Sequence, residues 1–263
     1  DKTISKDTTF EEKIDFTDLL GVSLLIEECL KTKTKKLDIG NCGLRDLTVI
    51  PELFECTHLE ELILSNEWAV YEDETWKRET STNKGNPNNI SFIPESISQL
   101  SELKILICGG GWNIFQNKKW DRWGISTLAP ITKLKKLEQL NISNNRLTSL
   151  KGLNKLTSLR FAHLNNNEIS RVEPLTDLLH LKELNLSNNK IGKVEFLSTL
   201  QNIHTLDLHH NYIKDLRPIR NIIERVGISN DKWELNTLNI AKNPLEHPPI
   251  EIVNLGKEVV LGT

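Results

Sequence analysis

The sequence predicts an α/β solenoid, a right-handed superhelix of stacked coils with a parallel β-sheet on its concave face and helical caps at both ends. Three observations predict it. Asparagines at positions 145, 167, 189 and 211 recur every 22 residues, apolar residues stand at fixed offsets around each of them, and non-repetitive amphipathic segments flank the array. A fixed period of this kind is typical of proteins whose coils bury their apolar sides only against neighbouring coils.

Four consecutive segments share the pattern Leu-x-x-Leu-x-Leu-x-x-Asn-x-Leu, with apolar replacements at some positions. They begin at Leu137, Leu159, Leu181 and Ile203. The alternating apolar pair in the pattern is a short strand whose alternate side chains point into the core. This is the signature of leucine-rich repeats, and the chain resembles that family. The resemblance implies that the strands of successive repeats stack side by side.

The recurring asparagines are predicted to have a structural role. Each one turns the chain inward, where its side-chain amide can satisfy backbone groups left unpaired in the coil. We expect a ladder made of Asn145, Asn167, Asn189, Asn211 and Asn243.

Weaker copies of the pattern extend the array to about eight repeats over residues 35–246. Residues 1–34 are predicted to form an N-terminal cap with an amphipathic helix from Phe16 to Lys31. Residues 247–263 are predicted to form a C-terminal cap with a closing helix from Ile250 to Val260. The sequence therefore predicts a single domain over residues 1–263.

Three insertions, near residues 67–88, 109–124 and 222–233, interrupt the array. The first two leave adjacent coils just after the strand, so we expect them to lie against each other along one rim. The run from Gly109 to Gly111 lacks the lysine of a phosphate-binding loop and is interpreted as a flexible start of the second insertion.

All six tryptophans lie in these insertions. Two interpretations remain open: the rings of the two neighbouring insertions pack on each other as a small satellite core, or they contact a partner protein directly. The candidate partner-binding tryptophans are Trp68, Trp76, Trp112, Trp120 and Trp123.

A second candidate patch lies on the concave face, where strand periodicity points small polar residues outward. Phe161 is the exception, because folding requires no aromatic ring on that surface. The candidate partner-binding residues are Phe161, His163, Asn165, Asp207 and His209. The alternative interpretation is an isolated surface aromatic without function.

Composition and motifs exclude several functional classes. The net charge of −3 and the lack of a long basic stripe disfavour nucleic-acid binding. No apolar run is long enough to insert into a membrane, and no metal, cofactor or catalytic motif is present. Three of the four cysteines replace apolar residues of the repeat, which favours reduced thiols in a cytoplasmic protein. The sequence thus favours a non-catalytic module that binds or regulates another protein or domain.

The C-terminal closure Asn243-Pro244-Leu245-x-x-Pro248-Pro249-x-Glu251-Ile252-Val253 resembles that of prokaryotic leucine-rich-repeat arrays of the Roco type. This resemblance implies a larger bacterial multidomain protein, in which the repeats precede a Ras-like GTPase and regulate it or recruit partners. Two alternatives are a secreted or surface adhesin resembling internalins, and a phosphatase-regulatory subunit built of 22-residue repeats. A signal peptide would favour the first alternative, and co-purification with a phosphatase would favour the second.

Overall fold

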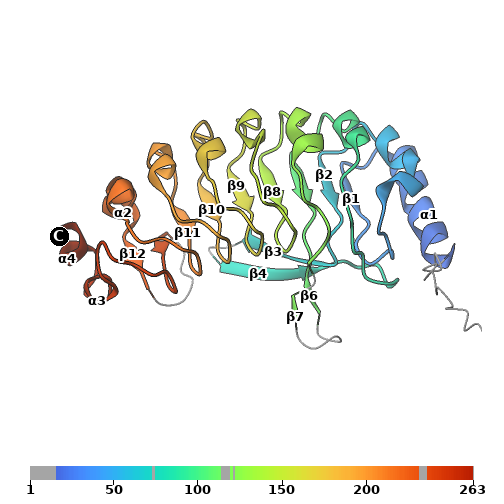
Figure 1. The fold of residues 1–263 in the computed structure, drawn as a ribbon. Helices are drawn as coiled ribbons and strands as arrows, with labels where there is room; N and C mark the ends of the chain where they lie inside the picture. The colour runs from blue at the N-terminus through green and yellow to red at the C-terminus, as the bar shows by residue number, and fades with distance from the viewer. Residues whose placement is uncertain (1–15, 73–74, 114–118, 121, 231–235, 263) are drawn as a thin grey trace, which may run out of the picture.

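The computed structural model of the chain describes residues 16–72, 75–113, 119–120, 122–230 and 236–262. Its main feature is a nine-stranded sheet in the order β1-β2-β5-β8-β9-β10-β11-β13-β12, in which all described pairs are parallel. Figure 1 shows a curved solenoid with this sheet along one side and short helices along the other. The predicted leucine-rich-repeat solenoid is confirmed.

The strands are short because each coil contributes only one alternating apolar pair. They are β1 (Lys36–Asp38), β2 (Glu61–Ile63), β5 (Ile105–Ile107), β8 (Gln139–Asn141), β9 (Phe161–His163), β10 (Glu183–Asn185), β11 (Thr205–Asp207), β12 (Ile228–Ser229) and β13 (Leu238–Asn239). Their registers align equivalent repeat positions, so Leu140 faces Ala162 and Leu184 faces Leu206. These four side chains are fully buried. One continuous apolar core therefore runs the length of the solenoid.

The convex side is built from single turns of 3-10 helix. They are η1 (Leu47–Val49), η2 (Pro51–Glu55), η3 (Glu95–Gln99), η4 (Ala129–Lys133), η5 (Leu153–Lys155), η6 (Glu173–Leu175), η7 (Glu195–Thr199) and η8 (Arg217–Ile219). Such turns suit this place because 3-10 helix is favoured only over a few residues. Each turn sends an apolar side chain inward, as Leu153, Leu175 and Leu197 do.

The ladder asparagines join each coil to the one before it. Asn167 is representative: its Nδ2 donates to the carbonyl of Ile142 in the preceding coil (3.1 Å) and to that of Leu164 in its own coil (3.0 Å). Its Oδ1 accepts from the N–H of Leu147, also in the preceding coil (2.9 Å). Equivalent hydrogen bonds are made by Asn145, Asn189, Asn211 and Asn243.

Asn88 is a further member of the ladder. Its Nδ2 donates to the carbonyls of Ile39 and Leu64 (both 2.8 Å), and its Oδ1 accepts from the N–H of Leu44 (2.8 Å). The first insertion separates Asn88 from its strand, so the 22-residue spacing does not identify Asn88 as a ladder residue. The pair Asn88-x-Ile90 is the signal that identifies it.

The two ends of the array are covered by helices. At the N-terminus, α1 (Phe16–Thr32) packs Val22, Ile26 and Cys29 onto the first coil. At the C-terminus, the prediction of a single closing helix from 250 to 260 is wrong. Two short helices form instead, α3 (Ile250–Val253) and α4 (Lys257–Gly262), because Gly256 between them adopts a left-handed φ of 93°. Among the described helices, none combines the length and apolar character that crossing a bilayer requires.

The third insertion adds both a helix and a strand. Helix α2 (Arg220–Val226) buries Ile222 and Ile223 on the convex side. The chain then forms β12, which pairs with β13 and occupies the outer edge of the sheet, although it precedes β13 in sequence. The insertion therefore completes the C-terminal end of the solenoid.

The ladder hydrogen bonds predict a large loss of stability in Asn167→Ala. The change leaves buried backbone groups in two coils without partners, so we expect the free energy of unfolding to fall by about 2–4 kcal/mol. Urea denaturation measures it. Asn165→Ala, at a half-buried asparagine outside the ladder, should change the same quantity by about 0.5 kcal/mol or less. Equal effects of the two substitutions would contradict the structural role of the ladder.

Candidate functional site

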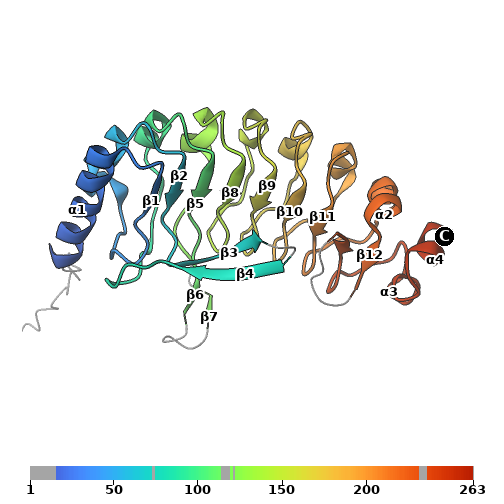
Figure 2. The ribbon, with the colours of Figure 1, turned by 180° about the vertical axis from the view of Figure 1, so that it is seen from behind.

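The first insertion forms an antiparallel hairpin, β3 (Glu67–Glu72) and β4 (Thr75–Thr80). In Figures 1 and 2 the hairpin lies across the ends of the middle strands instead of projecting into solvent. After β4 the chain returns toward the first repeat. There Ser81 Oγ and Asn83 Nδ2 both donate to the carbonyl of Gly40, at 3.0 and 2.9 Å. These bonds anchor the base of the hairpin.

The glycine run at the start of the second insertion allows close packing. A Cβ on Gly109 would stand 2.8 Å from the carbonyl oxygen of Ser143, and one on Gly111 would stand 2.8 Å from Cγ of Glu67. Both glycines are buried, and Ser65 Oγ exchanges two 2.8 Å hydrogen bonds with the backbone of Gly109. The interpretation of this run as a flexible start of a loop is therefore wrong.

Among the residues that the structure describes, the two insertions meet at their bases. Gly111 lies against Glu67. The second hairpin, β6 (Trp112–Asn113) and β7 (Lys119–Trp120), then projects away from the ends of the sheet strands, whereas β3–β4 runs across those ends. For the described residues, the expectation that the insertions lie together along one rim holds at that base. The side chains of Trp112 and Trp120 are not among those described.

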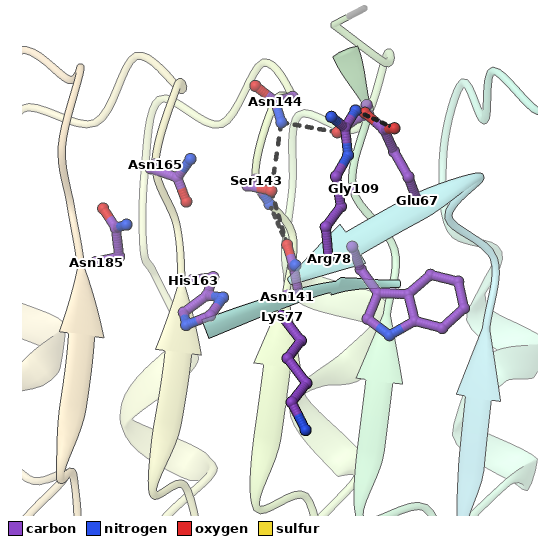
Figure 3. A pocket seen from close by; sticks show the side chains of 13 residues that line it. Glu67, Lys77, Arg78, Gly109, Asn141, Ser143, Asn144, His163, Asn165 and Asn185 are labelled. Atoms are coloured by element: carbon purple, nitrogen blue, oxygen red, sulfur yellow. Dashed lines mark hydrogen bonds and ion pairs between the residues drawn. The ribbon is translucent and has the colours of Figure 1, made fainter. Parts of the chain in front are cut away.

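A cavity of about 410 Å³ lies between the first hairpin and the concave sheet. We call it the concave cavity. Figure 3 shows His163, Asn165 and Asn185 on one side of it and the hairpin residues Lys77 and Arg78 on the other. Its lining residues are Glu67, Trp68, Lys77, Arg78, Gly109, Gly110, Gly111, Asn141, Ser143, Asn144, His163, Asn165 and Asn185. The hairpin wall is closed by an ion pair between Arg78 and Glu67.

The polar side chains on the floor of the cavity are hydrogen-bonded to one another, to backbone or to a neighbouring strand. Asn141 Oδ1 accepts from Ser143 Oγ (2.7 Å), and Asn144 Nδ2 donates to the carbonyl of Gly110 (2.7 Å). His163 Nε2 lies 2.7 Å from Oε1 of Glu183 on the neighbouring strand. Such a network holds the side chains in fixed orientations.

Several predicted partner-binding residues are less accessible than expected. His163 is only 8% exposed and Asp207 only 2% exposed. Asp207 accepts from the backbone N–H of His209 (3.0 Å) and pairs with its Nδ1 (2.9 Å), so it holds His209 in place. Phe161 and His209 are half-buried, and the guanidinium of Arg160 lies 5.9 Å from the ring centre of Phe161. The patch is therefore less open than strand periodicity indicates, because His163 contacts Glu183 on the neighbouring strand and Asp207 contacts His209 in its own coil. Its role in partner binding stays a prediction.

The tryptophans divide into different environments. Trp123 is fully buried in the main core, so both proposed roles, partner contact and satellite packing, are wrong for it. It stands where a ladder asparagine is expected, since Trp123-x-Ile125 matches Asn145-x-Leu147, and its Nε1 has no partner among the described residues. Trp68 lines the concave cavity. The side chain of Trp76 and the whole of Trp233 lie outside what the structure describes.

Among the described residues, the polar interactions available to a bound group are hydrogen bonds and ion pairs. All four cysteines are buried free thiols, and burial raises the pKa of Cys56 to about 12, which disfavours its reactive thiolate. No group of three or more histidine, cysteine or acidic side chains among the described residues is placed to hold a metal ion. The concave cavity therefore offers amides, a hydroxyl and a few charges to a bound group.

Comparisons with known proteins agree with this architecture. Residues 135–179, 157–199 and 179–221 match the family described as "Leucine Rich repeats (2 copies)". No curated protein matches the chain. Among solved structures, an internalin (inlF) from Listeria monocytogenes is 23% identical with a TM-score of 0.55, covering 85% of this chain and 63% of its own. These segments are leucine-rich repeats, and the described coils on either side continue the same solenoid.

Two further structures show the same fold. Internalin C2 from Listeria monocytogenes is 21% identical with a TM-score of 0.51, over 80% of each chain. A leucine-rich-repeat protein of Leptospira interrogans is 24% identical with a TM-score of 0.53, over 77% of this chain and 42% of its own. At these identities the likeness establishes the fold alone.

The glycine packing predicts a local sensitivity to added volume. In Gly109→Ala the new methyl group meets a backbone oxygen that cannot rotate away, so we expect a loss of about 1–3 kcal/mol of unfolding free energy and a lower Tm. Gly192→Ala is the matched control, because its added Cβ finds only one atom within contact range, at 3.7 Å. If Gly109→Ala melts at the wild-type temperature, the close approach of the two coils is wrong.

Proposed function

We propose that this chain is a protein-recognition module, and that the concave cavity binds an extended segment of a partner protein. The observation that carries the proposal is the cavity itself, bounded by a hairpin on one side and by strand-borne amides on the other. A side-chain amide can donate and accept at once, so it can pair with both the N–H and the C=O groups of an extended backbone. The indole of Trp68 supplies apolar contact area in the same cavity.

The geometry of the sheet supports an extended occupant. Asn141, His163 and Asn185 align in register on three consecutive strands, about 4.8 Å apart. A segment lying across the strands meets one polar side chain per coil, and the hydrogen-bonded network beneath keeps those side chains in place. This pre-organisation lowers the entropic cost of binding.

The cellular context is a second part of the proposal. The resemblance of the C-terminal closure to Roco-type arrays supports a cytoplasmic, non-catalytic regulatory module in a larger bacterial protein with a Ras-like GTPase. The four buried thiols favour a reducing compartment. The internalin-like and phosphatase-regulatory alternatives have only a shared repeat fold in their favour. A phosphate-loop motif downstream in the same reading frame tests this context.

The concave cavity is tested by blocking it. Peptides selected from a random library displayed on phage against the wild-type chain should bind Asn165→Trp at least about tenfold more weakly, because the indole fills the cavity. Asn154→Trp is the matched control, since Asn154 is also half-buried but lies in η5 on the convex side. Fluorescence polarisation of the labelled peptides measures the Kd.

A second variant removes the hairpin wall, with residues 68–79 replaced by a short glycine–serine turn. Its affinity for the same peptides should also fall by about tenfold, and circular dichroism confirms that the solenoid remains folded. The proposal is wrong if the selected peptides bind all variants alike, or if no peptide is selected.

A further inference from the structure

The turns that follow the strands form a second hollow, outside the concave cavity. It has a volume of about 450 Å³ and shares no lining residue with that cavity. We call it the rim groove. It is lined by Arg122, Asn166, Asn167, Glu168, Asn188, Asn189, Lys190, His210 and Tyr212.

The repeat itself generates the rows of side chains along this groove. Asn166, Asn188 and His210 each precede the ladder position of their coil and share a left-handed φ, of 56°, 53° and 53°. Two residues further along each turn stand Glu168, Lys190 and Tyr212. The same backbone conformation in each coil aligns these side chains, about 4.8 Å from one coil to the next.

Three cations converge on one carboxylate at the N-terminal side of the groove. Glu168 lies 2.7 Å from Nζ of Lys190 and 3.8 Å from the guanidinium of Arg122. The hydrogen bond and the charge of Lys190, together with the charges of Arg122 and Arg146, hold the pKa of Glu168 below its usual value. Three cations against one carboxylate leave two positive charges in excess among these residues, although the whole chain has a net charge of −3.

An exposed aromatic ring stands at the other end of the groove. Tyr212 is 61% exposed, while its backbone N–H is held by the carbonyl of Ile191 (2.8 Å). The backbone is therefore fixed, but the ring takes no part in the core. Exposed tyrosines beside charged side chains are frequent in protein interfaces, where they supply contact area at low entropic cost.

We propose that the rim groove binds an acidic, extended segment of a partner protein. Carboxylates of that segment pair with Arg122 and Lys190, and its backbone packs against the ring of Tyr212. From the coil of Glu168 to that of Tyr212 the groove spans two strand spacings, about 10 Å, which matches about three extended residues. Nucleic acid requires a longer basic stripe than three cations provide, so a protein segment is the better match. This site is independent of the concave cavity.

The probe for this proposal is a fluorescein-labelled oligoglutamate peptide, with an oligoglutamine peptide and an oligothymidylate of equal charge as comparison ligands. We expect the wild-type chain to bind oligoglutamate with an affinity that falls as NaCl is added, and to bind oligoglutamine at least about tenfold more weakly. Tighter binding of oligothymidylate, or failure to bind oligoglutamate at low salt, would overturn the proposal.

Paired variants locate the binding. In the double variant Arg122→Gln, Lys190→Gln the affinity for oligoglutamate should fall by about fivefold or more, because Glu168 is left to repel the peptide. The double variant Lys214→Gln, Arg217→Gln is the matched control, because it also removes two positive charges; Arg217 pairs with Asp215 at 2.7 Å and lies outside the groove. Lys214 forms an equally short 2.7 Å pair with Glu246 and is similarly exposed, but it lies outside the groove. Equal losses in the two double variants would show that only total charge matters, and would overturn the assignment of the site.

Discussion

The buried side-chain amide of each ladder asparagine is the interaction on which the rest of the structure depends. Through Nδ2 and Oδ1 it binds a carbonyl and an N–H of the preceding coil, as Asn167 does with Ile142 and Leu147. Backbone groups at this turn would otherwise be buried without partners, at a cost of about 1–3 kcal/mol each. The ladder therefore fixes where each coil turns away from its strand, and with it the registers of the sheet.

Both candidate sites follow from that fixed turn. The first hairpin leaves the array where strand β2 ends. It therefore starts at the ends of the sheet strands and can lie across the neighbouring ones, where it bounds the concave cavity. The rim groove lies on the turns themselves, where residues that share one left-handed conformation align Glu168, Lys190 and Tyr212. The coil with tryptophan at the ladder position, at Trp123, is the coil from which the second hairpin departs, so the change at the ladder position coincides with the second insertion.

The sequence predicted what is periodic and missed what depends on contacts between coils. The spacing of Asn145 to Asn211 was enough to place strands β8 to β11, because stacked coils of equal length align their strands. Strand β12, in the third insertion, has no such spacing. The path of the first hairpin has no such periodicity, and the need for glycine at 109 appears only once Ser143 of the next coil lies against it. The burial of His163 and Asp207 was missed for a related reason, since strand alternation gives the direction of a side chain but not the length of its neighbours.

Hydrogen exchange of the ladder-bound backbone amides tests the central claim most directly. The buried N–H groups of Leu147, Ile169 and Ile191 donate to asparagine side chains. The account therefore predicts that they exchange only through global unfolding, as slowly as the N–H of Leu164, which donates to the carbonyl of Asn185 in the neighbouring coil. Exchange of these three amides at the rate of the exposed turn residue Lys151 would contradict it.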